Sequence, residues 1–220
     1  MIRVWDIPIR LFHWLLVLAV IGLFVSGKLG GNWMEWHQRL GAFVLGLILF
    51  RLVWGFTGSF HARFVNFVRG PATAWAYLRA MIRKDPTADL PAYSGHNPLG
   101  ALSVVAMLLV IGFQAVSGLF ADDDILSSGP YAASVSKEVS DWLTKLHKLN
   151  SDLILILIGV HIAAILFYVL VKKENLLKAM FIGKKSKPDG ALDAAETGGR
   201  YWSSWLLALL VAGGVVVLMK

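Results

Sequence analysis

Histidines in long apolar segments are the residues of this sequence that first suggest chemistry. His147 and His161 share one such segment and lie 14 residues apart. In a helix, that spacing is a rise of about 21 Å and misses a whole number of turns by about 40°, so both rings leave nearly the same face. An imidazole inside a membrane helix is costly and normally faces the bundle interior and a partner. Two of them at different depths suggest two cofactors, one above the other.

The composition indicates an integral membrane protein. Hydrophobic residues make up 57% of the 220 residues and charged residues 16%, and the apolar residues lie in blocks near the length that crosses about 30 Å of hydrocarbon. The absence of cysteine excludes disulfides, iron–sulfur clusters and covalently attached c-type haem. The net charge of +7 does not indicate nucleic acid, because Lys and Arg follow membrane topology and form no basic stripe interleaved with aromatics.

The apolar blocks predict an all-α membrane protein, a four-helix transmembrane bundle with a fifth C-terminal transmembrane helix. The first three spans are predicted at 9–26, 37–56 and 98–120, and the fourth follows a loop that reaches Lys145 and ends at Lys172. Residues 71–84 read as an amphipathic helix on the membrane surface. We divide the chain into a core domain, a polar cytoplasmic linker and the additional helix, at residues 1–183, 184–199 and 200–220.

The distribution of Lys and Arg predicts the orientation. These residues concentrate in the first ten residues, in the 57–97 connection and after the fourth span, whereas the other two loops carry fewer and include acids. By the positive-inside rule, the N-terminus is cytoplasmic. The N-terminal segment lacks a cleavable signal pattern, so the first block is expected to remain as an anchor.

This topology sorts the histidines by depth. His37 and His147 begin spans that enter from the outer surface. His13 lies 14 residues before the outer end of the first span, and His161 lies 14 residues after His147, so both are about 21 Å deeper. The sequence therefore predicts an outer pair and an inner pair, His37 with His147 and His13 with His161.

Haem is the metal centre that these pairs suit. Zinc and di-iron sites usually add Asp, Glu or Cys, and none lies beside these histidines. Haem iron takes axial imidazole, and its macrocycle fills an apolar core. Two axial imidazoles leave no open coordination position, which favours electron transfer over oxygen binding. We expect two haem b groups with bis-histidine ligation.

Arg51 lies 14 residues after His37, on the same helix face and at the depth of the inner pair. A cation there needs an anion, and a haem propionate is a natural one. The alternative is an arginine that snorkels to the cytoplasmic surface. Gly41, Gly46 and Gly55 make room either for a macrocycle or for helix packing.

Other polar residues have two interpretations each. His61 and His96 flank the cytoplasmic connection and have a structural or surface role, or line a quinone or proton-entry site. Gln114 is expected to make a helix contact. The acids 122–124 begin a solvated loop or dock a basic electron carrier.

Four segments carry a family resemblance. VWDIPIRLFHW (4–14), HQRLGAFVLGLILFRLVWGFTGSFHARF (37–64), GHNPLGALSVVAMLLVIGFQAVSGLF (95–120) and the two histidines of the fourth span resemble the bacterial cytochrome b561 group. They look closest to its branch that includes the cytochrome b subunit of nickel–iron hydrogenases. The resemblance covers about residues 2–183, and all four histidines fall where that family's haem ligands fall.

The resemblance implies a four-helix core with two b-type haems in the bacterial inner membrane and its respiratory chain. Electrons would pass between a quinone pool, of ubiquinone or menaquinone, and a periplasmic or membrane partner. That partner would be a c-type cytochrome or a hydrogenase or dehydrogenase subunit. An electron-transfer subunit without catalytic residues of its own is favoured over a self-contained enzyme, and a homodimer is left open.

Two further functions are weighed. The first is a stand-alone oxidoreductase that acts on a small diffusible species, such as superoxide, at a positively lined outer pocket. The basic residues near the outer pair motivate it, namely Lys28, Arg39, Lys145 and Lys148. The second is a non-redox membrane anchor or transporter, whose histidines would relay protons or bind a transition metal.

Overall fold

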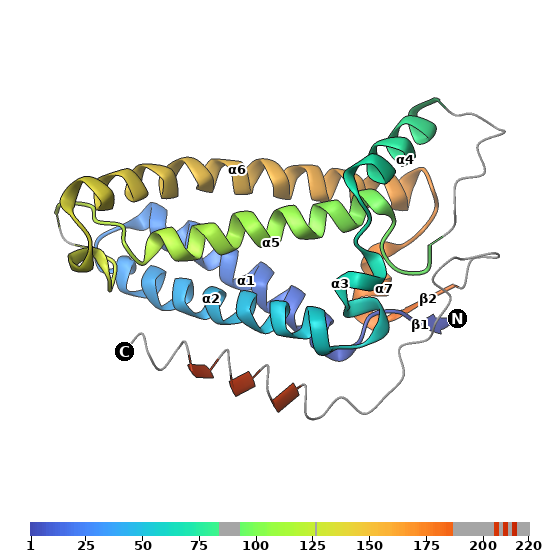
Figure 1. Ribbon diagram of the computed structural model, residues 1–220, viewed down its shortest axis with the longest axis horizontal. Coiled ribbons are helices and arrows are strands. Elements are labelled where there is room, and N and C mark those ends of the chain that lie inside the picture. The colour runs from blue at the N-terminus through green and yellow to red at the C-terminus, as the bar shows by residue number, and fades with distance from the viewer. Residues whose placement is uncertain (84–92, 126, 187–204, 207–208, 211–212, 215–220) are drawn as a thin grey trace. The chain divides into compact units, whose positions relative to one another are not determined.

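The computed structural model describes residues 1–83, 93–125, 127–186, 205–206, 209–210 and 213–214 (Figure 1). In chain order, the elements are β1 (Ile2–Arg3), α1 (Ile7–Leu29), α2 (Trp33–Thr57), η1 (Phe60–Ala62), α3 (Phe64–Phe67), α4 (Pro71–Arg83), α5 (Pro98–Gly118), η2 (Ala132–Ser134), α6 (Lys137–Leu170), α7 (Leu176–Ile182) and β2 (Lys184–Lys185).

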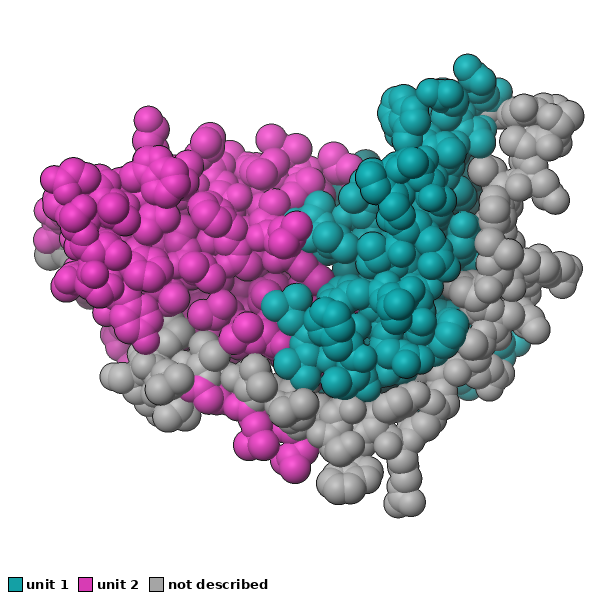
Figure 2. Space-filling model, viewed as in Figure 1, with its two compact units in different colours: residues 1–10, 52–106, 161–205 teal, residues 11–51, 107–160, 206–220 magenta. Residues whose placement is uncertain are grey.

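The chain divides into two compact units, coloured separately in Figure 2. Unit 1 consists of Met1–Arg10, Leu52–Ala106 and His161–Trp205, and unit 2 of Leu11–Arg51, Met107–Val160 and Leu206–Lys220. The four long helices α1, α2, α5 and α6 contribute residues to both units.

The four long helices confirm the predicted all-α membrane fold. Each is long and apolar enough to cross a membrane by length and composition. Of the predicted fifth span, 200–220, the structure describes six residues only, so this prediction lies almost entirely outside the described residues. The same holds for most of the predicted linker, 184–199.

Helix α6 begins earlier than the sequence suggested. The prediction of a loop that reaches Lys145 is wrong, because α6 starts at Lys137 and runs for 34 residues, or about 51 Å. The Ser136 hydroxyl accepts a hydrogen bond from the Val139 N–H, and Lys137 pairs with Asp141 one turn later. These first turns are polar. The prediction missed them because apolar blocks indicate only the part of a helix that lies in hydrocarbon.

In unit 1, Asp6 fixes the start of α1. Its carboxylate is 9% exposed and accepts three hydrogen bonds, from Ile9 N–H at 2.8 Å, Trp54 Nε1 at 2.9 Å and the Ser59 hydroxyl at 2.6 Å. The first bond caps the helix, and the other two tie its beginning to the end of α2 and the turn that follows. A buried carboxylate is tolerated when hydrogen bonds replace its hydration, as they do here.

The N-terminus of unit 1 is also joined to the end of α7. Gly183 adopts a φ of +77°, ends α7, and accepts hydrogen bonds at its carbonyl from Val4 and Trp5. Arg10 donates to the carbonyls of the last turn of α7. Strands β1 and β2 then pair antiparallel, so Lys184–Lys185 of the predicted linker forms a strand.

Helix α4 forms where the amphipathic helix was predicted. It ends at Arg83, and Lys84 lies outside the described residues. Ala74 is buried, whereas Trp75 is 59% exposed with the Arg79 guanidinium over its ring. A position on the membrane surface stays a prediction.

The Asp6 contacts predict a stability effect. Asp6→Asn replaces one carboxylate oxygen by an NH2 group, which cannot accept, so the amide cannot accept from Ile9, Trp54 and Ser59 together and at least one buried donor loses its acceptor. We expect a loss of about 1–3 kcal/mol in the free energy of unfolding, measured by thermal unfolding in detergent. Ser59→Ala, which removes one donor, should cost less. Unchanged melting of Asp6→Asn would contradict this role.

Candidate functional site

Unit 2 brings the imidazoles of His37 and His147 together. His37 is on α2 and His147 on α6, and their ring centroids lie 6.3 Å apart with the planes 73° from parallel. Two metal–nitrogen bonds of about 2.1 Å, with the half-width of each ring added, span roughly 6 Å. The spacing therefore has room for one metal atom between the rings, held by one nitrogen of each.

Helix α1 determines which nitrogen of His37 carries the proton. His37 Nδ1 lies 3.0 Å from the Leu23 carbonyl oxygen and 3.4 Å from the Ser26 hydroxyl. A carbonyl only accepts, so Nδ1 carries the proton and donates it. The lone pair of the neutral ring is then on Nε2, which is the nitrogen available to a metal.

Helix α5 does the same for His147. Its Nδ1 lies 3.0 Å from the Gln114 carbonyl oxygen and 3.1 Å from the Ser117 hydroxyl. This ring therefore also carries its proton on Nδ1 and leaves Nε2 available. Both outer histidines are thus prepared as metal ligands by the same kind of contact, from two different helices.

Each of these rings also packs against a glycine of the helix that holds it. A Cβ added at Gly27 would lie 3.1 Å from His37 Cε1 and Nδ1, and one at Gly118 would lie 2.9 Å from His147 Cε1. Both glycines follow a serine in the same tripeptide, Val-Ser-Gly, at 25–27 and at 116–118. The sequence reading missed these residues, although the repeated tripeptide was a visible signal.

Gln114 makes the helix contact that the sequence predicted. Asn150, three residues after His147, donates to the Gln114 side-chain oxygen at 2.7 Å and to the Val110 carbonyl at 3.0 Å. These bonds join α6 to α5 beside His147. The main chain of Gln114 holds the ring and its side chain holds the helix that carries the ring.

The predicted inner ligands fall in different units. His13 lies on the part of α1 in unit 2, half-buried and edge-on to Trp14 at 4.9 Å between ring centroids. His161 lies half-buried on the part of α6 in unit 1. The pairing of His13 with His161 stays a prediction.

Arg51 is buried on α2. It is 3% exposed, whereas a snorkelling arginine keeps its guanidinium at a surface, so the burial argues against that alternative. The contact with a haem propionate stays a prediction. Of the three glycines expected near a macrocycle, Gly41 borders open space, Gly46 is buried, and Gly55 makes room for the Phe64 ring instead.

His61 and His96 are packing residues of unit 1. His61 is buried next to Phe60, with ring centroids 5.1 Å apart. The His96 ring lies 4.6 Å from both Trp5 and Phe67. These aromatic contacts favour the structural interpretation of both histidines.

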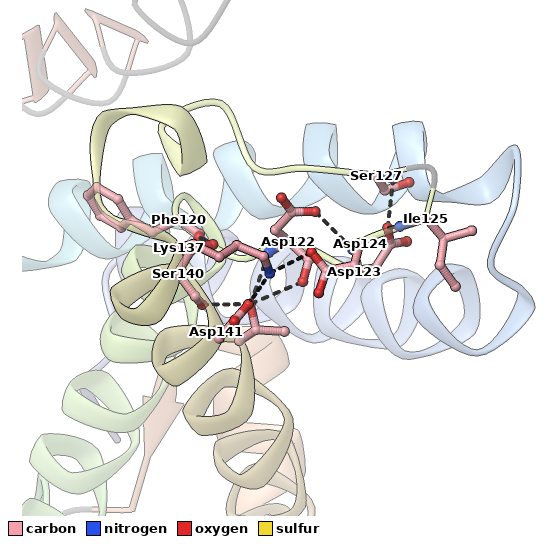
Figure 3. A network of polar contacts seen from close by, with 10 residues as sticks. Phe120, Asp122, Asp123, Asp124, Ile125, Ser127, Lys137, Ser140 and Asp141 are labelled. Carbon is pink, nitrogen blue, oxygen red and sulfur yellow. Dashed lines mark hydrogen bonds and ion pairs between the residues drawn. The ribbon is translucent and has the colours of Figure 1, made fainter.

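The acids of the outer loop shape the loop itself, as Figure 3 shows. Lys137 pairs with Asp124 and Asp141, and the Asp123 carboxylate accepts from two main-chain N–H groups of its own loop. The Ser140 hydroxyl donates to the Phe120 carbonyl at 2.8 Å, which ties the loop to α6. The dashed contacts in Figure 3 thus hold the loop on the first turns of α6.

A cavity of about 330 Å³ lies beside this loop in unit 2. Its lining residues are Asp122, Asp123, Asp124, Asp141, Thr144, Lys145 and Lys148. Four carboxylates therefore face two ammonium groups. Lys145 and Lys148 therefore do not form the positively lined pocket that was expected for an anion such as superoxide. Arg39, another of the basic residues considered, is paired with Glu35.

Comparison with known proteins adds an independent observation. The family model described as prokaryotic cytochrome b561 matches residues 4–183. A probable Ni/Fe-hydrogenase B-type cytochrome subunit of Azotobacter chroococcum mcd 1 is 26% identical, over 86% of this chain and 91% of its own length. The protein of the same name from Azotobacter vinelandii is 25% identical over the same shares.

A third relative is matched over a shorter region. The probable Ni/Fe-hydrogenase 1 B-type cytochrome subunit of Escherichia coli K12 is 26% identical over 52% of this chain and 57% of its own length. No solved structure matches the chain. The family match covers all four long helices, both partners of the outer imidazole pair and the two Val-Ser-Gly segments. The chain belongs to the prokaryotic cytochrome b561 family, which confirms the predicted resemblance and supports a multi-pass membrane protein that binds haem b and transfers electrons.

Proposed function

We propose that this protein is a di-haem electron conduit, in which His37 and His147 hold an outer haem b and His13 and His161 hold an inner one. The observation that carries the proposal is the outer pair itself. Two imidazoles from different helices lie 6.3 Å apart, and each is bound at Nδ1 by a main-chain carbonyl. That arrangement suits two axial ligands of one iron.

The chemistry of the donor set supports haem rather than a bare ion. Within the residues that the structure describes, no group of three or more His, Cys, Asp or Glu side chains could hold a metal ion. A porphyrin supplies four nitrogens, so the protein needs to add only two. Glycine at 27 and 118 leaves the rings room to lie against main chain.

The protein residues would then determine what the haem does. Haem, when bound, supplies a one-electron couple in an apolar core. His37 and His147 close both axial positions, which leaves none for a diffusible substrate. The carbonyls of Leu23 and Gln114 hold the imidazoles in one tautomer, so the site needs no rearrangement when an electron arrives.

The inner haem is argued from spacing and from Arg51. His161 follows His147 by 14 residues on one continuous helix, which places it about 21 Å further along the same face. Arg51, buried at 3% exposure and 14 residues after His37, is at the corresponding distance along α2. A propionate of the inner haem is the anion that we assign to this cation.

The relatives' names suggest the partner. They are named as cytochrome subunits of Ni/Fe-hydrogenases. We propose that this chain takes electrons from a hydrogenase subunit at its outer face and delivers them through the inner haem to a quinone. The distribution of Lys and Arg supports an inner-membrane location with the N-terminus in the cytoplasm.

The alternative of a stand-alone enzyme for superoxide is less well supported. The outer cavity carries more carboxylates than ammonium groups, which opposes the approach of an anion. Reduction of the purified protein by superoxide, followed by stopped flow, tests it. A reaction faster than that of free haem would favour this alternative.

Haem content tests the ligand assignment. We expect two haems per chain in the wild type, measured as the pyridine haemochrome. His37→Ala and His147→Ala should each remove the outer haem, and His13→Ala and His161→Ala the inner one, because each iron loses an axial ligand. His61→Ala and His96→Ala, which alter packing histidines, should retain both. A wild-type content of one haem contradicts the two-site proposal.

The glycines predict graded effects on the outer haem. Gly118→Ala places a Cβ 2.9 Å from the His147 ring, which must then move, whereas the contact at Gly27→Ala is 3.1 Å. Overpacking costs about 1–3 kcal/mol, so we expect Gly118→Ala to weaken outer-haem retention by roughly tenfold, and Gly27→Ala by less. Gly159→Ala, with no atom within 4 Å of its Cβ, is the matched control on α6. Equal haem retention in all three variants would refute this packing argument.

The partner assignment predicts hydrogen-dependent reduction. In native membranes that contain the hydrogenase, hydrogen should reduce both haems, as followed by the Soret and α bands. His37→Ala should abolish reduction of the inner haem by hydrogen, because the outer haem is the entry point, while dithionite still reduces it. Haems that dithionite reduces and hydrogen does not would exclude a hydrogenase partner and favour a c-type cytochrome or another dehydrogenase.

A further inference from the structure

The outer imidazoles of unit 2 are held by two copies of one local arrangement. On α1, Leu23 lies three residues before Ser26, and both contact His37 Nδ1. On α5, Gln114 lies three residues before Ser117, and both contact His147 Nδ1, as a carbonyl and a hydroxyl. A glycine follows each serine and meets the same ring. We call these two arrangements the serine cradles, Leu23–Gly27 and Gln114–Gly118.

The two serine hydroxyls have the same donor and acceptor roles. Ser26 Oγ donates to the Gly22 carbonyl at 2.7 Å and lies 3.2 Å from that of Leu23, and Ser117 Oγ donates to the Gln114 carbonyl at 3.1 Å. The hydroxyl proton is therefore directed at a main-chain carbonyl. The oxygen lone pairs remain for the imidazole N–H, which has a carbonyl and a hydroxyl oxygen as acceptors.

Serine often bonds back to its own helix without any further role. Two observations distinguish the cradles from that case. Ser26 and Ser117, which are 2% and 1% exposed, each lie within 3.4 Å of an imidazole nitrogen, and the tripeptide Val-Ser-Gly occurs at both places. Burial alone would also suit a helix-packing serine, but the imidazole contact and the repeated tripeptide are not needed for packing.

We propose that Ser26 and Ser117 are positioning residues that lower the reduction potential of the outer haem and fix the planes of its two axial imidazoles. The inference rests on the proposed function, because it requires that His37 and His147 hold iron. The serines touch neither the iron nor the electron partner. They act through the ligand, at the nitrogen opposite the metal.

The direction of the effect follows from ligand basicity. An acceptor on the Nδ1–H makes the imidazole more electron-rich, which favours the oxidised iron and lowers the potential. The Ser117 contact, at 3.1 Å, is shorter than the Ser26 contact, at 3.4 Å, so Ser117 has the larger effect. Because the two serines contact separate rings, the double variant is expected to shift the potential further than either single variant.

The cradles also limit rotation of the rings. Each imidazole has its acceptors on one side and a glycine main chain close by, so rotation would break the hydrogen bonds or press the ring onto the helix. The angle of 73° between the two planes is the result. The EPR spectrum of an oxidised low-spin haem depends on the angle between its ligand planes, which makes this geometry measurable.

Spectroelectrochemical titration of the purified di-haem protein in detergent tests the proposal. We expect Ser117→Ala to raise the potential of the outer haem, Ser26→Ala to raise it less, and the double variant to raise it by about 59 mV, which is a tenfold change in the ratio of reduced to oxidised haem for one electron. The inner haem should not shift. The haem that His37→Ala removes identifies the outer one.

Ser117→Thr and Ser117→Val form the matched pair, since they have nearly the same shape and differ in the hydroxyl. We expect Thr to keep the wild-type potential and EPR spectrum, and Val to shift both. Ser134→Ala is the control, because the exposed Ser134 makes the same bond to a carbonyl three residues earlier at 2.6 Å and contacts no imidazole. It should leave both potentials unchanged.

The outcomes separate this inference from the proposed function. If His37→Ala removes one haem and the serine variants leave its potential unchanged or lower it, the serine cradles have no tuning role and the di-haem proposal stands. If Thr and Val shift the potential equally, the effect is one of packing, and the inference is also wrong. If the wild type has no haem that depends on His37, the proposed function itself fails. If the Ser117→Ala variant does not retain the outer haem, the potential of the outer haem in Ser26→Ala tests the tuning role instead. A potential that is unchanged or lowered in Ser26→Ala then contradicts the inference.

Discussion

The hydrogen bond from each outer imidazole to a main-chain carbonyl is the interaction on which the outer site depends. A helical carbonyl already accepts from the N–H four residues later, but it has a second lone pair that a side chain can use. His37 uses that lone pair on Leu23, and His147 shares the one on Gln114 with the Ser117 hydroxyl. In an apolar interior such bonds are strong, because no water competes for the donor. They place the proton on Nδ1 and so leave the lone pair on Nε2.

The residues around each imidazole support that hydrogen bond. Glycine lets the ring approach the helix closely enough to reach the carbonyl, and serine fills the space next to the N–H with a second acceptor. Asn150 joins α6 to the same residue whose carbonyl holds His147. Substitution of these glycines or serines would therefore change the position or the electron density of a ring.

The ends of the helices determine where these residues sit. Asp6 caps α1 and so sets the register of His13, which follows by seven residues, about two turns. Asn97 caps α5 through Gly100 N–H at 2.8 Å and also donates to the Tyr168 hydroxyl on α6. If either helix began one residue later, the side chains and carbonyls along it would turn by about 100° relative to the neighbouring helices. Polar caps at one end thus control the chemistry of the apolar segment.

The sequence by itself determined the class of protein, the four spans and the family, since apolar length depends only on helix geometry. It also predicted the levels of the four histidines from their 14-residue spacing. It did not show that α6 begins at Lys137, because hydropathy does not detect polar helical turns outside the hydrocarbon. The number of Lys and Arg residues near the outer pair also suggested a positively charged pocket. That prediction failed because the sequence did not show that four Asp side chains lie beside Lys145 and Lys148. Only the tertiary structure decided which carbonyl, serine and glycine meet each outer ring. Those contacts join one helix to the next long helix, α1 to α2 and α5 to α6, and depend on how the two helices pack. Every residue has a main-chain carbonyl, so its residue type does not indicate which carbonyl will hold a ring.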